Sequence, residues 1–280
     1  MIERFILLLG GILFMATTAL ADKAGVGAWE NSSYKTLEWI EDTPGLSWYY
    51  NWRPDQMYHK GGGRRSVEFV PKIHSARDLR KPVKSGRKPK ALLGFNEPDG
   101  RGSHQAGLTP KKAAQLWPQL EKRGLRLGSP ATTQGQTLGK GSWQRRFMNE
   151  VARRGLRVDF MAVHYYSANG SVKEFERWLR KVHAEYKRPI WVTEFARIDW
   201  TRPGAVTHAQ NARFAEEAIA MMERLPFVER HAWFAANPYP WGGTVPEINL
   251  IGDDLRPTPT GKAFDRALSR ASGRGLARAD

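Results

Sequence analysis

The chain has 280 residues, no cysteine and a formal net charge of +16 at pH 7, from 44 Lys and Arg against 28 Asp and Glu. The length suits one large domain, and 41% hydrophobic residues suffice for a packed core, which excludes a wholly disordered chain. The lack of cysteine excludes disulfides, thiol nucleophiles and cysteine-ligated zinc. The positive charge leaves nucleic acid, an acidic envelope or no specific partner open.

Residues 1–21 have the pattern of a secretory signal peptide. An uncharged apolar run extends from Phe5 to Leu20, and Ala19 and Ala21 supply the small residues expected before a cleavage site. We expect removal of this segment and export to the periplasm or the medium, with no stable membrane insertion afterwards. An uncleaved membrane anchor is the alternative, because the run falls just short of the usual spanning length. An exported protein is not expected to bind cytoplasmic nucleic acid.

Eight short apolar runs alternate with amphipathic helical stretches along the rest of the chain, which is typical of βα units and a parallel sheet. The predicted strands cover residues 25–29, 46–52, 67–73, 91–97, 125–131, 158–166, 190–195 and 228–235. This pattern predicts an α/β fold, a single-domain (β/α)8 (TIM) barrel over residues 22–270, with a disordered tail at 271–280. A doubly wound open sheet is the alternative, although no Gly-x-Gly-x-x-Gly follows a strand and no P-loop is present.

Three helices have readable start signals. Thr109 precedes Pro110, a cap followed by proline at the first helical position. Ser171 and Glu174 have the spacing of a capping box before a helix whose apolar residues share one face. Thr207 begins a third helical stretch, with Phe214, Ala218 and Met221/Met222 predicted to face inward.

Polar residues stand where several predicted strands end, which is where a barrel of this kind carries its chemistry. The fourth strand leads into Asn96 and Glu97, and the seventh leads into Glu194. A carboxylate that closes an apolar strand is costly unless it faces a wet or functional pocket. Both carboxylates are therefore expected to face each other across the mouth of the barrel.

Two carboxylates at one site indicate a glycosidase. One carboxyl group donates a proton to the leaving oxygen and the other, ionised, attacks the anomeric carbon. Their mutual repulsion and burial would separate the two pKa values and so assign the roles. The plainer interpretation is that Glu97 and Glu194 form ordinary salt bridges with some of the many arginines.

Four motifs in order resemble glycoside hydrolase family 128, the catalytic domain of the alkali-sensitive-linkage type, within the clan of retaining (β/α)8 glycosidases. They are Leu-Gly-Phe-Asn-Glu-Pro-Asp at 93–99, Phe-Met-Ala-Val-His-Tyr-Tyr at 160–166, Trp-Val-Thr-Glu-Phe-Ala at 191–196 and Thr-Pro-Thr-Gly-Lys at 258–262. The resemblance covers residues 25–268. It implies an endo-β-1,3-glucanase that acts on β-glucan without a cofactor.

The resemblance also implies roles for particular residues. Glu97 would be the acid/base and Glu194 the nucleophile of a double displacement, with their carboxyl groups about 5–5.5 Å apart, against roughly 6.5–9.5 Å in an inverting enzyme. Asn96 would bind the 2-hydroxyl of the sugar that is attacked.

Five further residues would bind substrate by the same resemblance. His164 and Tyr166, on one side of the sixth strand, would hold the nucleophile and the sugar, and Trp233 would form the floor under the sugar ring. Asn51 and Trp52, at the end of the second strand, would line a neighbouring subsite. Each has a structural alternative, since an interior histidine or a large aromatic residue on a strand is often part of the core.

Other classes of function stay open. The barrel could bind glycan in the envelope without cleaving it, or hydrolyse another β-linked polysaccharide. No histidine spacing indicates a metal site, and no Gly-x-Ser-x-Gly elbow indicates a serine hydrolase. We expect a monomer. A basic stretch, 72–90, could bind a polyanion, but its segment 81–90 precedes the fourth strand and should lie at the far end of the barrel from the cleft.

Overall fold

The computed structural model describes residues 23–57 and 66–273, so the predicted signal peptide at 1–21 and most of the predicted tail lie outside the described residues. Within these described ranges there are eight parallel strands, and each overlaps the corresponding predicted run. They are β1 (Ala24–Gly27), β2 (Trp48–Tyr50), β3 (Glu68–Phe69), β4 (Ala91–Leu92), β5 (Arg126–Leu127), β6 (Met161–Tyr166), β7 (Ile190–Ala196) and β8 (Val228–Phe234). The predicted α/β barrel is confirmed.

The strands close into one ring. Six pair in the order β3-β2-β1-β8-β7-β6, and β4 pairs with β5. Single parallel bridges join the two groups, from Lys72 to Leu93 and from Gly128 to Phe160. Because every neighbour is parallel, all carboxyl ends of the strands open on the same face.

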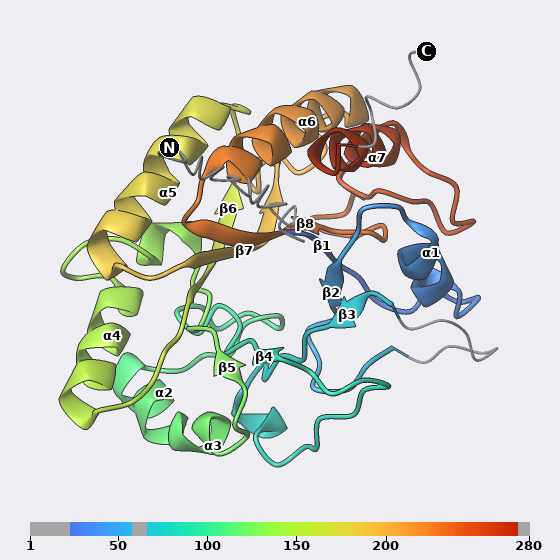
Figure 1. Cartoon of the computed structure of the whole chain (residues 1–280). Helices are drawn as coiled ribbons and strands as arrows, with labels where there is room; N and C mark the ends of the chain where they lie inside the picture. The colour runs from blue at the N-terminus through green and yellow to red at the C-terminus, as the bar shows by residue number, and fades with distance from the viewer. Residues whose placement is uncertain (1–22, 58–65, 274–280) are drawn as a thin grey trace, which may run out of the picture.

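Helices surround the strands, as Figure 1 shows. They are α1 (Thr36–Asp42), α2 (Pro110–Leu116), α3 (Pro118–Glu121), α4 (Trp143–Arg154), α5 (Val172–Tyr186), α6 (His208–Arg224) and α7 (Pro259–Ala271). The order departs from an ideal βα repeat, because the chain between β3 and β4 forms only a 3-10 turn at Ala76–Asp78. The barrel is therefore regular around β6–β8 and irregular around β2–β5.

The predicted helix starts are confirmed, with one difference. Thr109 and Thr207 accept hydrogen bonds from the backbone amides of Lys112 and Gln210. Ser171 likewise accepts from the amide of Glu174, but the Glu174 carboxylate takes a bond from Asn169 instead of closing the box. Each of these side-chain caps satisfies one of the unpaired amides of the first turn.

Two apolar clusters hold the fold. One fills the barrel interior, and its largest members include Trp48, Phe160 and Trp191. The larger one lies between the strands and the outer helices. Arg230 closes the amino-terminal end of the interior, 2.7 Å from a Glu68 carboxylate oxygen and over the ring of Trp191. The interior is thus a packed core, and a barrel of this kind carries its chemistry at the carboxyl end.

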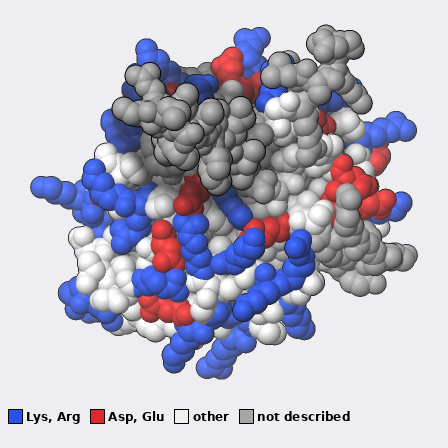
Figure 2. Space-filling model, viewed as in Figure 1, with Lys and Arg blue, Asp and Glu red and all other residues white. Residues whose placement is uncertain are grey.

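Basic side chains are widely spread on the face in Figure 2, with acidic side chains among them. Not every basic residue of the stretch 72–90 lies at the surface, because Lys72 is fully buried inside the barrel. Lys81 pairs with Asp78, while Lys88 and Lys90 are exposed just before β4. Across residues 23–57 and 66–273, no helix combines the length and apolar character needed to cross a membrane.

Candidate active site

Glu194 lies at the carboxyl end of β7 and points into the barrel mouth. Its Oε1 accepts hydrogen bonds from Trp52 Nε1 at 2.9 Å and Tyr50 Oη at 3.2 Å, and its Oε2 accepts from Tyr166 Oη at 2.5 Å. Only 6% of the side chain is exposed. Three donors converge on this one buried carboxylate and fix its position.

A β-bulge in β7 turns this carboxylate inward. Trp191 faces the barrel interior, so strict alternation would place Thr193 inside and Glu194 outside. The pairing with β6 and with β8 shifts register between Val192 and Phe195, and this inserts one extra residue. A bulge of this kind redirects a side chain next to an active site. Glu194 therefore faces the interior while Phe195 returns to the outer core.

Glu97 lies beyond the short strand β4, on a backbone turned into the left-handed region with φ +37°. Its amide donates to the carbonyl of Ala131 at 2.7 Å, which anchors the turn to the chain after β5. Its side chain is 19% exposed. A non-glycine residue in this conformation is strained, and strain of this kind persists where the surrounding structure enforces it.

His164 on β6 lies between the two carboxylates. Its Nδ1 is 3.0 Å from Glu97 Oε1, and its Nε2 is 3.2 Å from Glu194 Oε1, although this second contact is too poorly directed for a hydrogen bond. One ligand atom from each of the three side chains lies within 4.8 Å of the others. The two carboxylates are thus close enough to act on the two atoms of one substrate bond.

The pKa of Glu97 lies below its usual value. Burial raises this pKa, but hydrogen bonds from His164 and Gln105 and the charge of Lys72 more than offset the effect of burial. This direction is opposite to the one that a proton donor needs. A ligand that makes Glu97 a donor must therefore change the contacts of its carboxylate.

Lys72, Tyr50 and Gln105 also face the pair, and the sequence interpretation did not single them out. Lys72 Nζ is fully buried, has no hydrogen-bond partner among the described residues and lies 5.7 Å from the centre of the Tyr50 ring. Burial lowers the pKa of Lys72 to about 8, although the charges of Glu194 and Glu97 act to raise it. Gln105 Nε2 donates to Glu97 Oε2 at 3.0 Å. Alternation from Trp52 would have found Tyr50, and Lys72 lies inside the predicted strand at 67–73, next to buried Ile73. No sequence signal indicates Gln105.

Among the described residues, Glu97, His164 and Glu194 also form a group with donor types and spacing suited to a metal ion. Each ring nitrogen of His164, however, faces a different carboxylate, at 3.0 and 3.2 Å. A cation bound by all three residues would lie on the lone pair of one His164 ring nitrogen. Both carboxylates would then have to be near that same nitrogen. The arrangement fits a carboxylate pair bridged by an imidazole better than a metal centre.

Two of the predicted substrate-binding residues lie elsewhere. Trp233 is fully buried, its ring packs on Phe195 and Phe214, and its Nε1 donates to the carbonyl of Ile248. It therefore faces the outer helices and cannot form the floor under a sugar at the carboxylate pair. The amide of Asn51 is used within its own loop, where Nδ2 donates to the Asp55 carbonyl and Oδ1 accepts from the Arg53 amide.

The period of two in a strand explains the correction at Trp233. Side chains at adjacent positions of β8 face opposite sides, so one of Trp233 and Phe234 must face away from the site. Asn51 and Trp52 instead follow the end of β2, where the backbone of Trp52 is left-handed with φ +57°. The structure places Trp52 and Phe234 at the mouth, with ring centres 5.7 Å apart.

Asn96, His164, Tyr166 and Trp52 lie around the carboxylate pair. Asn96 is 5% exposed, and its Nδ2 donates to the carbonyl of His104. Its Oδ1 is buried and has no hydrogen-bond partner in the part of the chain that the structure describes. An unpartnered buried amide oxygen can accept a hydrogen bond from a ligand hydroxyl. Tyr166, Trp200, Phe234 and Tyr239 form a continuous set of ring contacts at the mouth.

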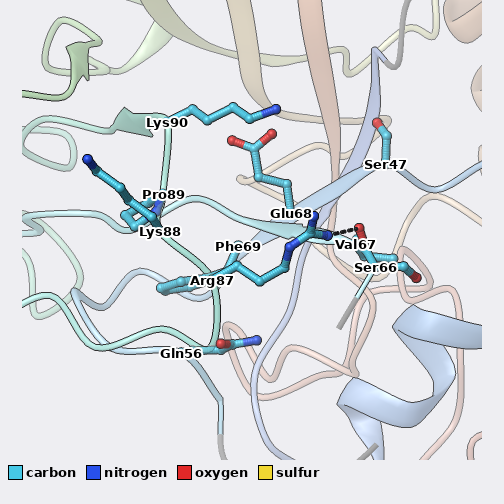
Figure 3. Close-up of a pocket in the computed structure, with 10 residues that line it drawn as sticks. All are labelled: Ser47, Gln56, Ser66, Val67, Glu68, Phe69, Arg87, Lys88, Pro89 and Lys90. Carbon is cyan, nitrogen blue, oxygen red and sulfur yellow. Dashed lines mark hydrogen bonds between the residues drawn. The ribbon is translucent and has the colours of Figure 1, made fainter. Parts of the chain in front are cut away.

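A second hollow, shown in Figure 3, lies at the other end of the barrel. Its volume is about 330 Å³, and its lining includes Ser47, Glu68, Lys88 and Lys90, which precede or begin strands β2, β3 and β4. In a parallel barrel these amino ends lie opposite the carboxylate pair. The hollow is therefore separate from the candidate active site.

Comparison with known proteins found a matching family model and similar chains. A family model described as "Glycosyl hydrolase catalytic core" matches residues 26–264. The chain is 28% identical over 219 residues to alkali-sensitive linkage protein 1 of Schizosaccharomyces pombe. This match covers 73% of the chain but only 39% of that protein, so the chain spans well under half of its length.

Solved structures are similar over nearly the whole barrel. An endo-β-1,3-glucanase of family 128, subgroup I, from Amycolatopsis mediterranei, crystallised as a variant with laminaripentaose, is 32% identical. The match has a TM-score of 0.73 and covers 88% of this chain and 99% of that one. A subgroup II endo-β-1,3-glucanase from Sorangium cellulosum is 27% identical with a TM-score of 0.68, covering 88% and 98%.

Proposed function

The chain belongs to glycoside hydrolase family 128, and from this we propose that it cleaves β-1,3-glucan within the chain by double displacement. Glu97 acts as the acid/base and Glu194 as the nucleophile. The observation that carries this proposal is the pair of carboxylates with His164 between them, one ligand atom of each residue within 4.8 Å of the others.

The spacing of the carboxylates supports the retaining course. In retaining enzymes the two carboxyl groups are about 5–5.5 Å apart, because the nucleophile itself contacts the anomeric carbon. Inverting enzymes need roughly 6.5–9.5 Å to admit a water molecule. The short contacts of Glu97 and Glu194 with the two nitrogens of one imidazole fit the smaller separation.

In the first half of the reaction, the Glu194 carboxylate forms a bond to the anomeric carbon while the glycosidic bond breaks. The leaving oxygen takes the proton of Glu97. In the second half, Glu97, now ionised, takes a proton from water, whose oxygen displaces Glu194 from the anomeric carbon. Trp52, Tyr50 and Tyr166 hold Glu194 in line during attack, because all three bind its oxygens.

Support for the β-1,3 linkage comes from the similar endo-β-1,3-glucanases, one of them crystallised with laminaripentaose. The set of aromatic rings at the mouth supports sugar binding, since Tyr166, Trp200 and Tyr239 present apolar faces beside the carboxylates. The site is complete within one chain, so we propose that the protein acts as a monomer.

The test is a panel of β-1,3-, β-1,4- and mixed-linkage glucans, incubated with the wild type, Glu97→Gln and Glu194→Gln. We expect short oligosaccharides early in the digestion of the β-1,3-glucan and strong loss of activity in both variants. Glu217→Gln, a substitution at an exposed position of α6, is the control and should have wild-type activity. If only another linkage is cleaved, the proposed substrate class is wrong. The activities of Glu97→Gln and Glu194→Gln on that glucan would still test the roles of the two carboxylates.

A barrel that binds glycan without cleaving it is the outcome if the wild type binds laminari-oligosaccharides and releases no reducing ends. The presence of both carboxylates in one connected site argues against this alternative. We also propose export to the periplasm or medium, which the apolar run from Phe5 to Leu20 supports. Detection of the protein, shortened by residues 1–21, outside the cytoplasm would test that proposal.

A further inference from the structure

The loop after β4 folds back over the carboxylate of Glu97 and places one amide against it. Gln105 Nε2 donates to Glu97 Oε2 at 3.0 Å. The oxygen of the same amide accepts from the backbone N–H of Gly102 at 2.9 Å. Because this N–H needs an acceptor, the amide is oriented with its NH₂ group toward Glu97.

Gly100 makes room for this amide. A Cβ atom at position 100 would lie only 1.9 Å from Gln105 Oε1, far inside contact distance. Gly100 is not among the residues with positive φ, so its backbone would tolerate alanine. Alanine at this position would displace the end of the flexible Gln105 side chain without removing it.

The contact occupies the oxygen of Glu97 that His164 leaves free. His164 Nδ1 is near Oε1, and Gln105 Nε2 donates to Oε2. A hydrogen bond donated to a carboxylate favours its charged form. While Gln105 donates to Oε2, that oxygen is not free to carry a proton toward a glycosidic oxygen.

We propose that Gln105 is a positioning residue for the acid/base. It holds Glu97 ionised when the leaving-group side of the site is empty, and the glucan displaces it when the glycosidic oxygen reaches Glu97. This inference rests on the proposed function. It links the state of Glu97 to the two half-reactions, since an ionised Glu97 is the base of the second half and a protonated one is the acid of the first.

Other charged or titratable groups face Glu97 from the surrounding elements. They are Lys72 after β3, His164 and Tyr166 on β6, Glu194 on β7, Tyr50 on β2 and Tyr239 after β8. None of them lies on the 99–107 loop. They remain in place when Gln105 is changed, so a variant at position 105 isolates the contribution of this amide.

The test uses Gln105→Leu, Gln105→Glu and Gly100→Ala, with Gly141→Ala as a control because nothing lies near its Cβ position. The ¹³C signal of the Glu97 carboxyl group, assigned through Glu97→Gln, is titrated in each protein, and kcat/KM on β-1,3-glucan is measured against pH. Gln105→Leu and Gly100→Ala should move the Glu97 titration and the alkaline limb of kcat/KM to higher pH. Gln105→Glu should move both further, because it adds a like charge.

Unchanged titration of Glu97 in folded Gln105→Leu and Gln105→Glu proteins would overturn the inference, as would a shift of the same size in Gly141→Ala. The carboxyl titration does not depend on turnover, so it decides whether Gln105 holds Glu97 ionised even if no glucan is cleaved. A wild type without hydrolytic activity would instead contradict the proposed function.

Discussion

The two carboxylates stand in halves of the barrel that are built differently. Glu194 is on β7, a seven-residue strand paired on both sides, in the half that carries the long helices α5 and α6. Glu97 follows β4, a two-residue strand, in the half where only a 3-10 turn separates β3 from β4. The backbone at Glu97 has a φ of +37°.

The hydrogen bonds of the two carboxylates differ in the same way as the halves that carry them. Glu194 takes hydrogen bonds from an indole and two phenols, all on or directly after strands β2 and β6. Glu97 takes one from His164 on a strand and one from Gln105 on an exposed loop. A nucleophile must stay in line and ionised, whereas an acid/base must change its protonation in each half-reaction. The regular half therefore suits Glu194, and the irregular half suits Glu97.

The largest expected effect is that the Glu97 and Glu194 variants respond differently to two substrates. Glu97→Gln should lower kcat/KM on β-1,3-glucan by about 10²–10⁴-fold, the usual contribution of an acid. It should retain the first half-reaction on a dinitrophenyl β-glycoside of laminaribiose, whose leaving group needs no proton. Glu194→Gln should lose both activities, which a burst of dinitrophenolate in rapid kinetics would measure. Equal loss of both activities in Glu97→Gln would contradict the assigned roles.

A smaller effect is expected from one phenol that holds Glu194. Tyr166→Phe removes the hydrogen bond to Oε2 and should lower kcat/KM by about 10- to 100-fold, since a bond to a charged group contributes about 1.5–3 kcal/mol. Tyr165→Phe is the matched control, because the neighbouring ring faces the outer core and stacks on Phe175. Equal kinetics of the two variants would show that Tyr166 does not hold the nucleophile.

Lys72, the buried lysine near both carboxylates, should change the stability of the fold in a way that depends on pH. The pKa of Lys72 is about 8 in the folded protein against an ordinary 10.5, so the folded state binds this proton less tightly and the charged lysine destabilises it. Lys72→Met should stabilise the protein by about 3 kcal/mol below pH 8. The gain should fall between about pH 8 and 10.5, where folded wild type loses the proton. Melting temperatures of the wild type and Lys72→Met, measured against pH, test this prediction, with Lys88→Met at an exposed position as the control. A stability gain of Lys72→Met that grows above pH 8 would contradict it.

The smallest kinetic effect is expected at Trp233. Trp233→Phe removes a buried hydrogen bond and part of a ring that packs on Phe195 and Phe214, so stability should fall by about 1–3 kcal/mol. The KM for laminari-oligosaccharides should stay unchanged, because the ring lies outside the barrel. Phe234→Ala, at the mouth beside Trp52, should raise KM instead. Chemical denaturation and initial rates distinguish the two outcomes.

The sequence predicts this architecture well where periodicity is strong. All eight strands, the three helix caps and the convergence of Glu97 with Glu194 follow from apolar runs and from residues at strand ends. Alternation within a strand would also have placed Tyr50 and Phe234 inside and Asn51 and Trp233 outside. It fails at Glu194, because a bulge reverses the side on which that residue lies. The contact of Gln105 with Glu97 depends on how the loop after β4 folds back, which no local pattern contains.

The most direct test of the assigned roles is to trap the glycosyl-enzyme. A 2-deoxy-2-fluoro-β-laminaribiosyl fluoride should react with the wild type, slow the second half-reaction and leave one covalent glycosyl group. Mass spectrometry of the digested protein should place that group on the peptide that contains Glu194. A group on the peptide that contains Glu97, or steady turnover of this substrate to the inverted anomer with no labelled peptide, would contradict the account.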